Sequence, residues 1–346
     1  MRLAWPDVGP AEAKAVAEVL EGGQLTMGPK VAEFERGLAQ ACEVEHAVAV
    51  SSGTAALHLA VLALGIGPGD EVVVPAYTFP ATANVVALTG AKPVLVDVDP
   101  ATMNLDPAKV EIGPKSKAIV AVDIFGRPAR IDELPDGVPV LEDAAGALGA
   151  KRQGRPCGSL GALACLSFHP RKIVTTGEGG AITTDDAELA DSIRRMRHHG
   201  IEPRGEFEIA QPGLNYRLSD ILCAVGIPQL ARLDELLAAR TRIAAGYTER
   251  LADLVETPSV DDGDVHGWQA YVVQVDDAAS VIAGLRERGI EAQVGTYALH
   301  RLAAYRAQGE FAGASRVFDR AVALPFHTRL TDAELDRVVE AVAELA

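Results

Sequence analysis

Three segments of the chain carry side chains that could act together on a small molecule. They are SSGTAALH at residues 51–58, PVLED at 139–143 and SFHPRKIVTTGEGG at 167–180. The first predicts a turn of small residues that opens a helix, the second a strand that ends on Asp143, and the third places Lys172 after a β-rich apolar stretch. A phosphate-binding turn, a carboxylate and an amine are what a site for pyridoxal 5'-phosphate (PLP) requires, because it must hold the phosphate, pair the pyridine nitrogen and form a Schiff base with the aldehyde.

The turn before the first of these helices predicts an anion-binding site. Gly53 lets the backbone approach an anion closely, and the helix that follows directs unpaired N–H groups toward it. Thr54 adds a hydroxyl group. The alternative is an ordinary helix cap in which Ser52 or Thr54 only starts the helix, and the turn taken alone favours this alternative.

Asp143 is expected at a ligand crevice because carboxylates at the C-terminal ends of parallel strands lie there. A buried aspartate needs a cationic partner, and a pyridinium N–H is one. The alternative is an aspartate that caps the next helix. Strand alternation predicts that the neighbouring Glu142 points to the opposite face of the sheet.

Lys172 has small neighbours instead of a basic patch, although a solvated surface lysine is the open alternative. Ser167 could add a second hydroxyl to the phosphate site. Phe79 follows a strand end, where a ring can stack on a flat cofactor; a core phenylalanine is the alternative, and Phe79 taken alone favours it. His169 is interpreted as structural.

Alternating strands and helices predict an α/β fold with parallel pairing and right-handed crossovers. Continuous apolar strands indicate a sheet that is covered on both faces. The pattern of elements changes after Pro258, and a domain boundary is expected near residues 235–250, which divides the chain into a large domain, 1–240, and a small C-terminal domain, 241–346. Helices are expected at 11–21, 30–42, 54–64, 81–88, 187–197, 219–251, 278–288 and 332–345, and strands at 47–50, 71–77, 92–98, 117–124, 138–141, 162–168, 181–184 and 269–275.

Composition narrows the class of protein. The 346 residues are 48% hydrophobic and 23% charged, as expected for a globular α/β protein of one or two domains. A net charge of −16 argues against a nucleic-acid partner. Neither a signal peptide nor a membrane-spanning run is recognisable. The four cysteines show no CxxC spacing, so we expect core thiols in a reducing cytoplasm and no metal site.

Further motifs extend the pattern over nearly the whole chain. They are LTMGPK at 25–30, SSGTAALHL at 51–59, GPGDEV at 67–72, YTF at 77–79, EDAA at 142–145, SFH at 167–169, TTGEGG at 175–180, GLNYR at 213–217 and ALP at 323–325. Together with Lys172 they are highly specific, and the chain resembles the DegT/DnrJ/EryC1/StrS family of fold-type-I PLP sugar aminotransferases. The resemblance implies a large domain with a mostly parallel seven-stranded sheet flanked by helices, and a smaller C-terminal α/β domain.

The resemblance also implies a role for each candidate residue. Lys172 would bind the cofactor covalently and then move protons, and Asp143 would pair the pyridine nitrogen. Asn215 resembles the residue that reaches the phosphate from the other subunit, which implies a homodimer with shared active sites. The phosphate would be bound by Gly53, Thr54 and Ser167. Phe79 would stack on the ring.

The chain departs from the family pattern in three places. Gly146 stands where the family usually has Gln or His, so water or a substrate group is expected to fill the gap. The connection at 131–138 is short and is expected to be mostly loop. Asp123 stands where histidine is frequent. These departures leave the core chemistry in place and put the identity of the substrate in doubt.

The resulting hypothesis is an aminotransferase that moves an amino group from an amino acid, glutamate or glutamine, to a nucleotide-linked keto-deoxysugar. Within the family, a keto-cyclitol acceptor is an alternative, whereas sugar 3-dehydratases carry histidine at the position of Lys172. A non-catalytic regulator with a PLP-type fold is the alternative from another class.

Overall fold

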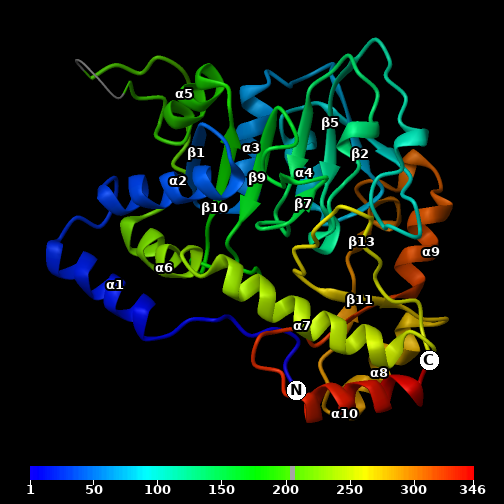
Figure 1. The fold of residues 1–346 in the computed structure, drawn as a ribbon. Helices are drawn as coiled ribbons and strands as arrows, with labels where there is room; N and C mark the ends of the chain where they lie inside the picture. The colour runs from blue at the N-terminus through cyan, green and yellow to red at the C-terminus, as the bar shows by residue number, and fades with distance from the viewer. Residues whose placement is uncertain (203–206) are drawn as a thin grey trace.

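A seven-stranded sheet forms the centre of the computed structural model, which describes residues 1–202 and 207–346 (Figure 1). The strand order is β1-β10-β9-β6-β5-β2-β4. Four neighbouring pairs are parallel, and β10 is antiparallel to both β1 and β9. The strands are β1 (His46–Val50), β2 (Glu71–Pro75), β4 (Lys92–Val96), β5 (Ser116–Val122), β6 (Val140–Asp143), β9 (Leu163–Ser167) and β10 (Gly180–Thr184).

The mostly parallel sheet is confirmed, but the parallel pairing expected from the alternation of strands and helices does not hold for β10. The segment between β9 and β10, residues 168–179, contains no helix. A parallel return needs a long crossover that spans the sheet. The loop instead turns the chain back beside β9, so the residues around Lys172 stay at one edge of the sheet.

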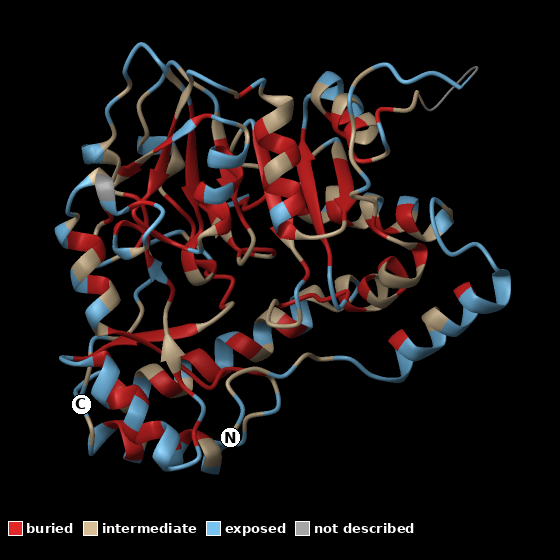
Figure 2. Ribbon diagram, turned by 180° about the vertical axis from the view of Figure 1, so that it is seen from behind, coloured by how far each residue is buried: buried red, intermediate tan, exposed pale blue. Residues whose placement is uncertain are grey.

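Helices cover both faces of the sheet, as the apolar strands predicted. Figure 2 shows the strands almost entirely buried, and every residue of β10 is buried. Two separate apolar clusters lie against the sheet, one that contains α3 and α4 and one that contains α2 and part of α6. The helices are α2 (Pro29–Cys42), α3 (Gly53–Ala63), α4 (Ala81–Leu88), α5 (Ala187–Met196) and α6 (Asp220–Leu230).

The C-terminal part has its own antiparallel sheet, in the order β11-β14-β12, and its own apolar core around Tyr247 and Tyr271. The sequence predicted one strand and two helices after residue 258, so this prediction was incomplete. It missed β12, α9 and β14. The elements are α7 (Leu233–Leu251), β11 (Tyr271–Gln274), α8 (Ala278–Glu287), β12 (Gln293–Val294), α9 (Ala312–Arg320), β14 (Ala321–Leu324) and α10 (Asp332–Ala343).

The single helix predicted at 219–251 is two helices, α6 and α7, which are interrupted at Ala231 and Arg232. Helix α7 contributes Leu236 to the core under the large sheet and Ile243 to the C-terminal core. The division predicted between residues 240 and 241 falls inside this helix and stays a prediction. Met1 also packs against the C-terminal core, although residues 1–240 were assigned to the large domain.

The remaining elements are short or peripheral. Helix α1 (Pro10–Gly22) packs against α6 at the edge of the molecule (Figure 1). The connection at 131–138 is loop apart from one short 3-10 helix, as predicted. The other short elements are β3 (Tyr77–Thr78), β7 (Lys151–Arg152), β8 (Arg155–Pro156), β13 (Tyr297–Ala298), and the 3-10 helices η1 (Pro107–Lys109), η2 (Ile124–Gly126), η3 (Ile131–Glu133), η4 (Leu299–Arg301) and η5 (Arg306–Gln308).

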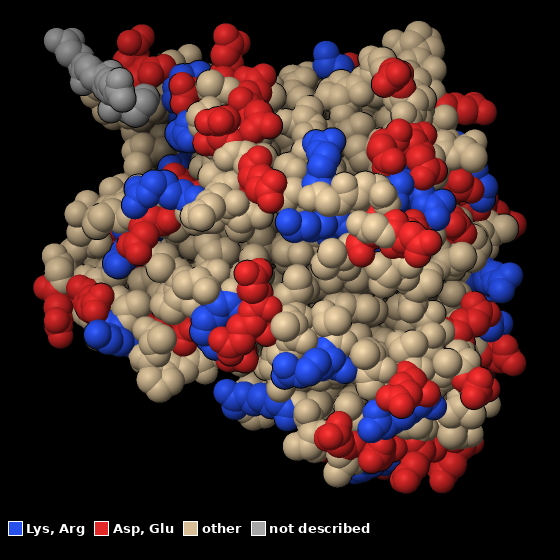
Figure 3. All heavy atoms as spheres, in the orientation of Figure 1, with Lys and Arg blue, Asp and Glu red and all other residues tan. Residues whose placement is uncertain are grey.

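The surface and the cysteines agree with the composition. On the face drawn in Figure 3, Lys and Arg side chains are scattered among Asp and Glu. All four cysteines are free and buried. Across residues 1–202 and 207–346, every helix is too short or too polar to cross a bilayer.

Gly180, the first residue of the antiparallel strand β10, packs closely against the residues that begin helix α3. This contact can be tested. A Cβ atom at Gly180 would lie 2.4 Å from the Ser52 carbonyl oxygen and 2.6 Å from the Gly53 nitrogen. We therefore expect Gly180→Ala to displace the first turn of α3, to lower the melting temperature and to weaken PLP binding at least about tenfold, which corresponds to about 1.4 kcal/mol. The control is Gly22→Ala, where a Cβ meets nothing within 4 Å. Wild-type PLP affinity in Gly180→Ala would contradict the expectation.

Candidate active site

Lys172 lies in the loop between β9 and β10, and buried polar contacts fix this loop. The Thr175 hydroxyl donates to the Phe168 carbonyl at 2.8 Å. Gln229 of α6 accepts from the Thr175 N–H at 3.1 Å and donates to its carbonyl at 2.7 Å. The Lys172 N–H donates to the His169 carbonyl at 2.8 Å, so the lysine is part of a turn. These contacts hold Lys172 in place before any ligand binds.

The Lys172 amine is partly buried and makes no ion pair with the residues that the structure describes. Burial lowers its pKa from the usual 10.5 to about 8, and the nearby charges of Arg171 and Arg240 act in the same direction. The negative charge of Asp143 opposes the shift. With a pKa of about 8, roughly a tenth of the amines are unprotonated at pH 7, which is far more than for an ordinary lysine. A nucleophile or a general base requires this unprotonated form.

Asp143 is the last residue of β6 and is almost completely buried. Its carboxylate accepts from the Thr82 hydroxyl at 2.8 Å and from the Ala145 N–H at 3.2 Å. Burial raises the pKa of Asp143, while these two hydrogen bonds and Lys172 oppose the shift. A cation in front of the carboxylate would stabilise its charged form, and a pyridinium N–H is such a group.

Glu142 and Asp143 have different partners, as the alternation of the strand predicted. Glu142 accepts from the N–H groups of Gly158 and Leu160 on one side of β6, at 2.7 and 2.8 Å. Asp143 accepts from Thr82 instead. Asp143 is the carboxylate whose charge acts on Lys172, because each of the two groups shifts the pKa of the other.

The first turn of α3 has free donors and lies against Ser167. Ser52 is the helix cap, because its hydroxyl oxygen accepts from the Ala55 N–H at 3.0 Å. The Thr54 hydroxyl is not used as a cap and is exposed. A Cβ atom at Gly53 would lie 2.9 Å from the Ser167 Cβ, so only glycine allows this approach. The turn thus places Gly53, Thr54 and Ser167 side by side, as a phosphate group would require.

The Phe79 side chain is 62% exposed, so the alternative of a core phenylalanine is wrong. Its ring meets that of Tyr297 edge to face, at 6.2 Å between centroids. The backbone of Tyr297 pairs with Thr78, which holds the two rings together. Asn215 is also exposed, and its side chain makes no hydrogen bond to the described residues. Its backbone forms a bridge to His198.

Gly146, one of the departures from the family pattern, lies next to Gln269. A Cβ atom at Gly146 would be 3.4 Å from both Cβ and Cγ of Gln269. The side chain of Gln269 thus borders the space that a larger residue at position 146 would occupy.

Sequence reasoning did not identify Thr82, Gln229, Arg240 or Gln269. Each acts through a contact between segments far apart in the chain, so no local motif marks it.

Comparison with known proteins decides the family. The family model for "DegT/DnrJ/EryC1/StrS aminotransferase family" matches residues 6–343. The chain belongs to this family. A GDP-perosamine synthase from Caulobacter vibrioides is 41% identical, over 99% of this chain and 97% of the relative.

Two solved structures are similar over nearly their whole length. The aminotransferase TlmJ from Streptoalloteichus hindustanus has a TM-score of 0.95 at 35% identity, covering 99% of this chain and 98% of the other. The PLP form of the putative sugar aminotransferase Spr1654 from Streptococcus pneumoniae has a TM-score of 0.94 at 30% identity, with the same coverage of both chains. As a member of the family, the chain is a PLP-dependent aminotransferase with an α/β fold.

The residues of this chain fit PLP. The carboxyl group of Asp143 is buried and has no charged partner at ion-pair distance among the described residues. Because burial raises its pKa, a cation beside it would stabilise the charged form. The amine of Lys172 is unpaired, and the turn at Gly53 leaves donors for a phosphate. These three features match the pyridine nitrogen, the aldehyde and the phosphate of the cofactor.

Thr82 offers a direct test of how Asp143 is held. In Thr82→Val the carboxylate loses a hydrogen bond, and such bonds to charged groups contribute about 1.5–3 kcal/mol. Because the pKa of Asp143 should then rise further, we expect kcat to fall roughly tenfold or more, and the acid limb of the pH profile to move to higher pH. The measurement is kcat across pH. Thr89→Val is the control, since that hydroxyl of the same helix region donates only to the Val86 carbonyl. An unmoved acid limb would show that Thr82 does not tune the carboxylate.

Proposed function

We propose that this aminotransferase moves an amino group from glutamate or glutamine to a nucleotide-linked keto-deoxysugar. The observation that carries the proposal is the presence of a Lys172 amine without an ion-pair partner near the buried Asp143 carboxylate, in a chain that is 41% identical to a GDP-perosamine synthase. The name of that relative refers to a GDP-linked sugar, which supports a nucleotide-linked acceptor here.

Asp143 would hold a proton on the pyridine nitrogen. Hydrogen bonds from Thr82 and from the Ala145 N–H fix its carboxylate. The carboxylate would therefore not need to reorient when the ring nitrogen binds. When bound, PLP supplies the electron sink for the carbanion that forms at Cα of the donor. The role of Asp143 in this step is electrostatic: an ionised carboxylate stabilises the protonated ring nitrogen.

Lys172 would carry the proton between the donor Cα and the C4' carbon of the cofactor. The amine has a pKa of about 8, so it accepts a proton readily and also gives it up near neutral pH. The turn held by Thr175 and Gln229 restricts the lysine to one side of the site. Proton transfer thus requires only movement of the side chain.

The cofactor phosphate would be held by Gly53, Thr54 and Ser167, and the exposed ring of Phe79 would stack on the pyridine. The N-terminal end of α3 favours an anion because its N–H groups point out of the helix. Tyr297 supports Phe79 from the side.

Asn215 would complete the phosphate site of a second subunit. Its exposed side chain is free of hydrogen bonds within the described residues, as expected for a group that acts across an interface. We therefore propose a homodimer with two composite sites. The four buried free thiols support a reducing, cytoplasmic location.

The function can be tested by separating the two half-reactions. With wild-type protein, glutamate or glutamine should convert the cofactor to its amine form, and a nucleotide-linked keto-deoxysugar should return it to the aldehyde form. A keto-cyclitol serves as the competing acceptor. Lys172→Ala should bind PLP without the covalent link that borohydride fixes, and its turnover should fall by several orders of magnitude, because the proton carrier is lost. Absorbance of the cofactor follows both steps. Wild-type turnover in Lys172→Ala, or reaction with the cyclitol alone, would refute the respective part of the proposal.

The composite site can be tested by mixing two inactive variants, Lys172→Ala and Asn215→Ala, under conditions that exchange subunits. In a mixed dimer with shared sites, one site carries both changes and the other carries neither. We expect roughly a quarter of wild-type activity to return, because about half of the dimers mix and each has one intact site.

The mixing experiment has two controls: Asn215→Ala alone must be impaired, and subunit exchange must be demonstrated with a labelled chain. If both hold and no activity returns, Asn215 acts in its own subunit.

A further inference from the structure

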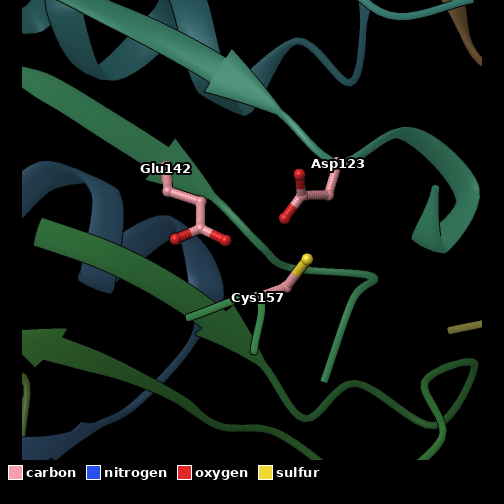
Figure 4. Close-up of side chains that lie close together, drawn as sticks. All are labelled: Asp123, Glu142 and Cys157. Atoms are coloured by element: carbon pink, nitrogen blue, oxygen red, sulfur yellow. The ribbon is translucent and has the colours of Figure 1, made fainter. Parts of the chain in front are cut away.

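A buried cluster of Asp123, Glu142 and Cys157 lies next to the active site but has no role in the chemistry described above. The candidate ligand atoms of the three side chains all lie within 4.8 Å of one another (Figure 4). Asp123 follows β5, Glu142 lies on β6 beside Asp143, and Cys157 follows β8. The two carboxyl groups point toward each other in the figure.

The two carboxyl groups are buried without a cation. Asp123 is 1% exposed and Glu142 is 0% exposed. Neither forms an ion pair with Lys, Arg or His among residues 1–202 and 207–346. Two negative charges at this distance in a medium of low polarity repel each other strongly, so both cannot be ionised together near neutral pH.

The hydrogen bonds identify which carboxyl group keeps its charge. Glu142 accepts from the N–H groups of Gly158, Leu160 and Gly161, at 2.7, 2.8 and 3.4 Å. Asp123 accepts from only one, the Ala129 N–H at 2.7 Å, through Oδ1. Three N–H donors stabilise the carboxylate of Glu142, whereas Asp123 has much less support for a charge.

The second oxygen of Asp123 is the decisive atom. Oδ2 is fully buried and has no hydrogen-bond partner among the described residues. An unsatisfied buried oxygen is costly. A proton on Oδ2 turns it into a donor toward Glu142, which removes both the unsatisfied atom and the charge repulsion.

We propose that Asp123 and Glu142 share one proton at neutral pH, and that this carboxyl–carboxylate hydrogen bond joins the ends of β5 and β6. The Asp123 N–H also donates to the Asp143 carbonyl at 3.1 Å, so the same turn contacts the backbone of the cofactor-binding aspartate. The residue that carries the shared proton is therefore hydrogen-bonded to the backbone of Asp143. The proposal does not depend on the identity of the acceptor.

The surrounding titratable groups agree with a single proton. Burial raises the pKa of Asp123 well above its usual value, and the negative charge of Glu142 adds to the shift. The thiols of Cys157 and Cys42, which lie near the pair, also have raised pKa values because they are buried. They remain neutral and add no charge to the cluster.

A metal ion fits the same atoms less well. Two carboxylates and a thiol are metal-ligating groups, but both oxygens of Glu142 already accept backbone N–H groups. A cation placed there would meet these N–H dipoles and would find only three protein ligands in a dry site, whereas structural zinc sites have four. A proton needs no such space.

The experiment compares wild-type holoenzyme with Asp123→Asn. The asparagine can keep the bond from Ala129 and donate to Glu142 through its amide, without a titrating proton. Infrared spectra at about pH 8 should show the C=O band of a protonated carboxyl group in the wild type and lack it in Asp123→Asn. Asp143→Asn is the control, since Asp143 is a second buried carboxyl group with a raised pKa; this variant should keep the Asp123 band.

A second measurement uses stability and has a defined sign. The unfolded aspartate ionises near pH 4, and the folded one keeps its proton to much higher pH, so the folded state binds one more proton in between. The stabilising effect of the proton is complete below about pH 4 and is lost as pH rises toward the folded pKa. The unfolding equilibrium constant of the wild type should therefore rise about tenfold per pH unit relative to Asp123→Asn in this window. Urea denaturation at several pH values measures it.

The outcomes separate the alternatives. Loss of the band in Asp123→Asn, together with the relative slope, supports the shared proton. An unchanged band, or parallel pH dependences of the two proteins, overturns it. A melting temperature that zinc chloride raises in the wild type but not in Asp123→Asn, and that a chelator lowers again, overturns it in favour of a metal site. If Asp123→Asn does not fold, Glu142→Gln provides the same infrared comparison.

Discussion

The carboxyl group of Asp143 imposes the strongest constraint on the structure, because it is buried at the end of β6. Removing a charge from water costs several kcal/mol unless partners compensate. Thr82, the Ala145 N–H and the charge of Lys172 provide part of the compensation, yet the pKa of Asp143 stays raised. The protein alone thus leaves the carboxylate incompletely paired. A protonated ring nitrogen would complete the pairing, so the burial that is unfavourable for the isolated protein would favour the form of the cofactor that accepts electrons.

The sheet explains how residues from distant segments come to surround this carboxylate. Parallel strands β5 and β6 end at the same edge, which brings the segments after them together. The antiparallel strand β10 then returns to the start of α3, where Gly180 lies against Ser52. An all-parallel sheet would need another crossover at this place, and the loop that carries Lys172 could not pass directly beside the helix terminus. The one reversed strand is therefore part of the active-site architecture.

The sequence predicted those features of the fold and the site that depend on a local pattern of residues. The alternation of β6 predicted that Glu142 and Asp143 face opposite surroundings, and apolar runs predicted a sheet covered on both faces. The break between α6 and α7 was missed because Ala231 and Arg232 are both compatible with a helix. The hydroxyl of Thr82 and the amide of Gln229 were missed for another reason: their partners lie 61 and 54 residues away, and no spacing in the sequence indicates such contacts.

Two of the three departures from the family pattern, Asp123 and Gly146, lie on segments that contact each other, and this bears on substrate specificity. The turn that begins at Asp123 leads to Gly126, where a Cβ atom would lie 2.9 Å from the Gly146 carbonyl oxygen and 2.9 Å from the Trp268 nitrogen. Gly146 in turn faces Gln269, so three segments meet with backbone in close contact. A Cβ atom at position 146 would be in van der Waals contact with Gln269.

The polar side chain beside Gly146 is therefore that of Gln269, which belongs to the C-terminal part of the chain. The amide of Gln269 makes no hydrogen bond to the described residues, and its side chain is partly exposed. A residue of the family's usual type at position 146 would project from the end of β6 instead. Since direction decides which hydroxyl or carbonyl of a bound sugar a polar group can reach, positions 146 and 269 have to be interpreted as a pair when the specificity of this enzyme is compared with that of its relatives.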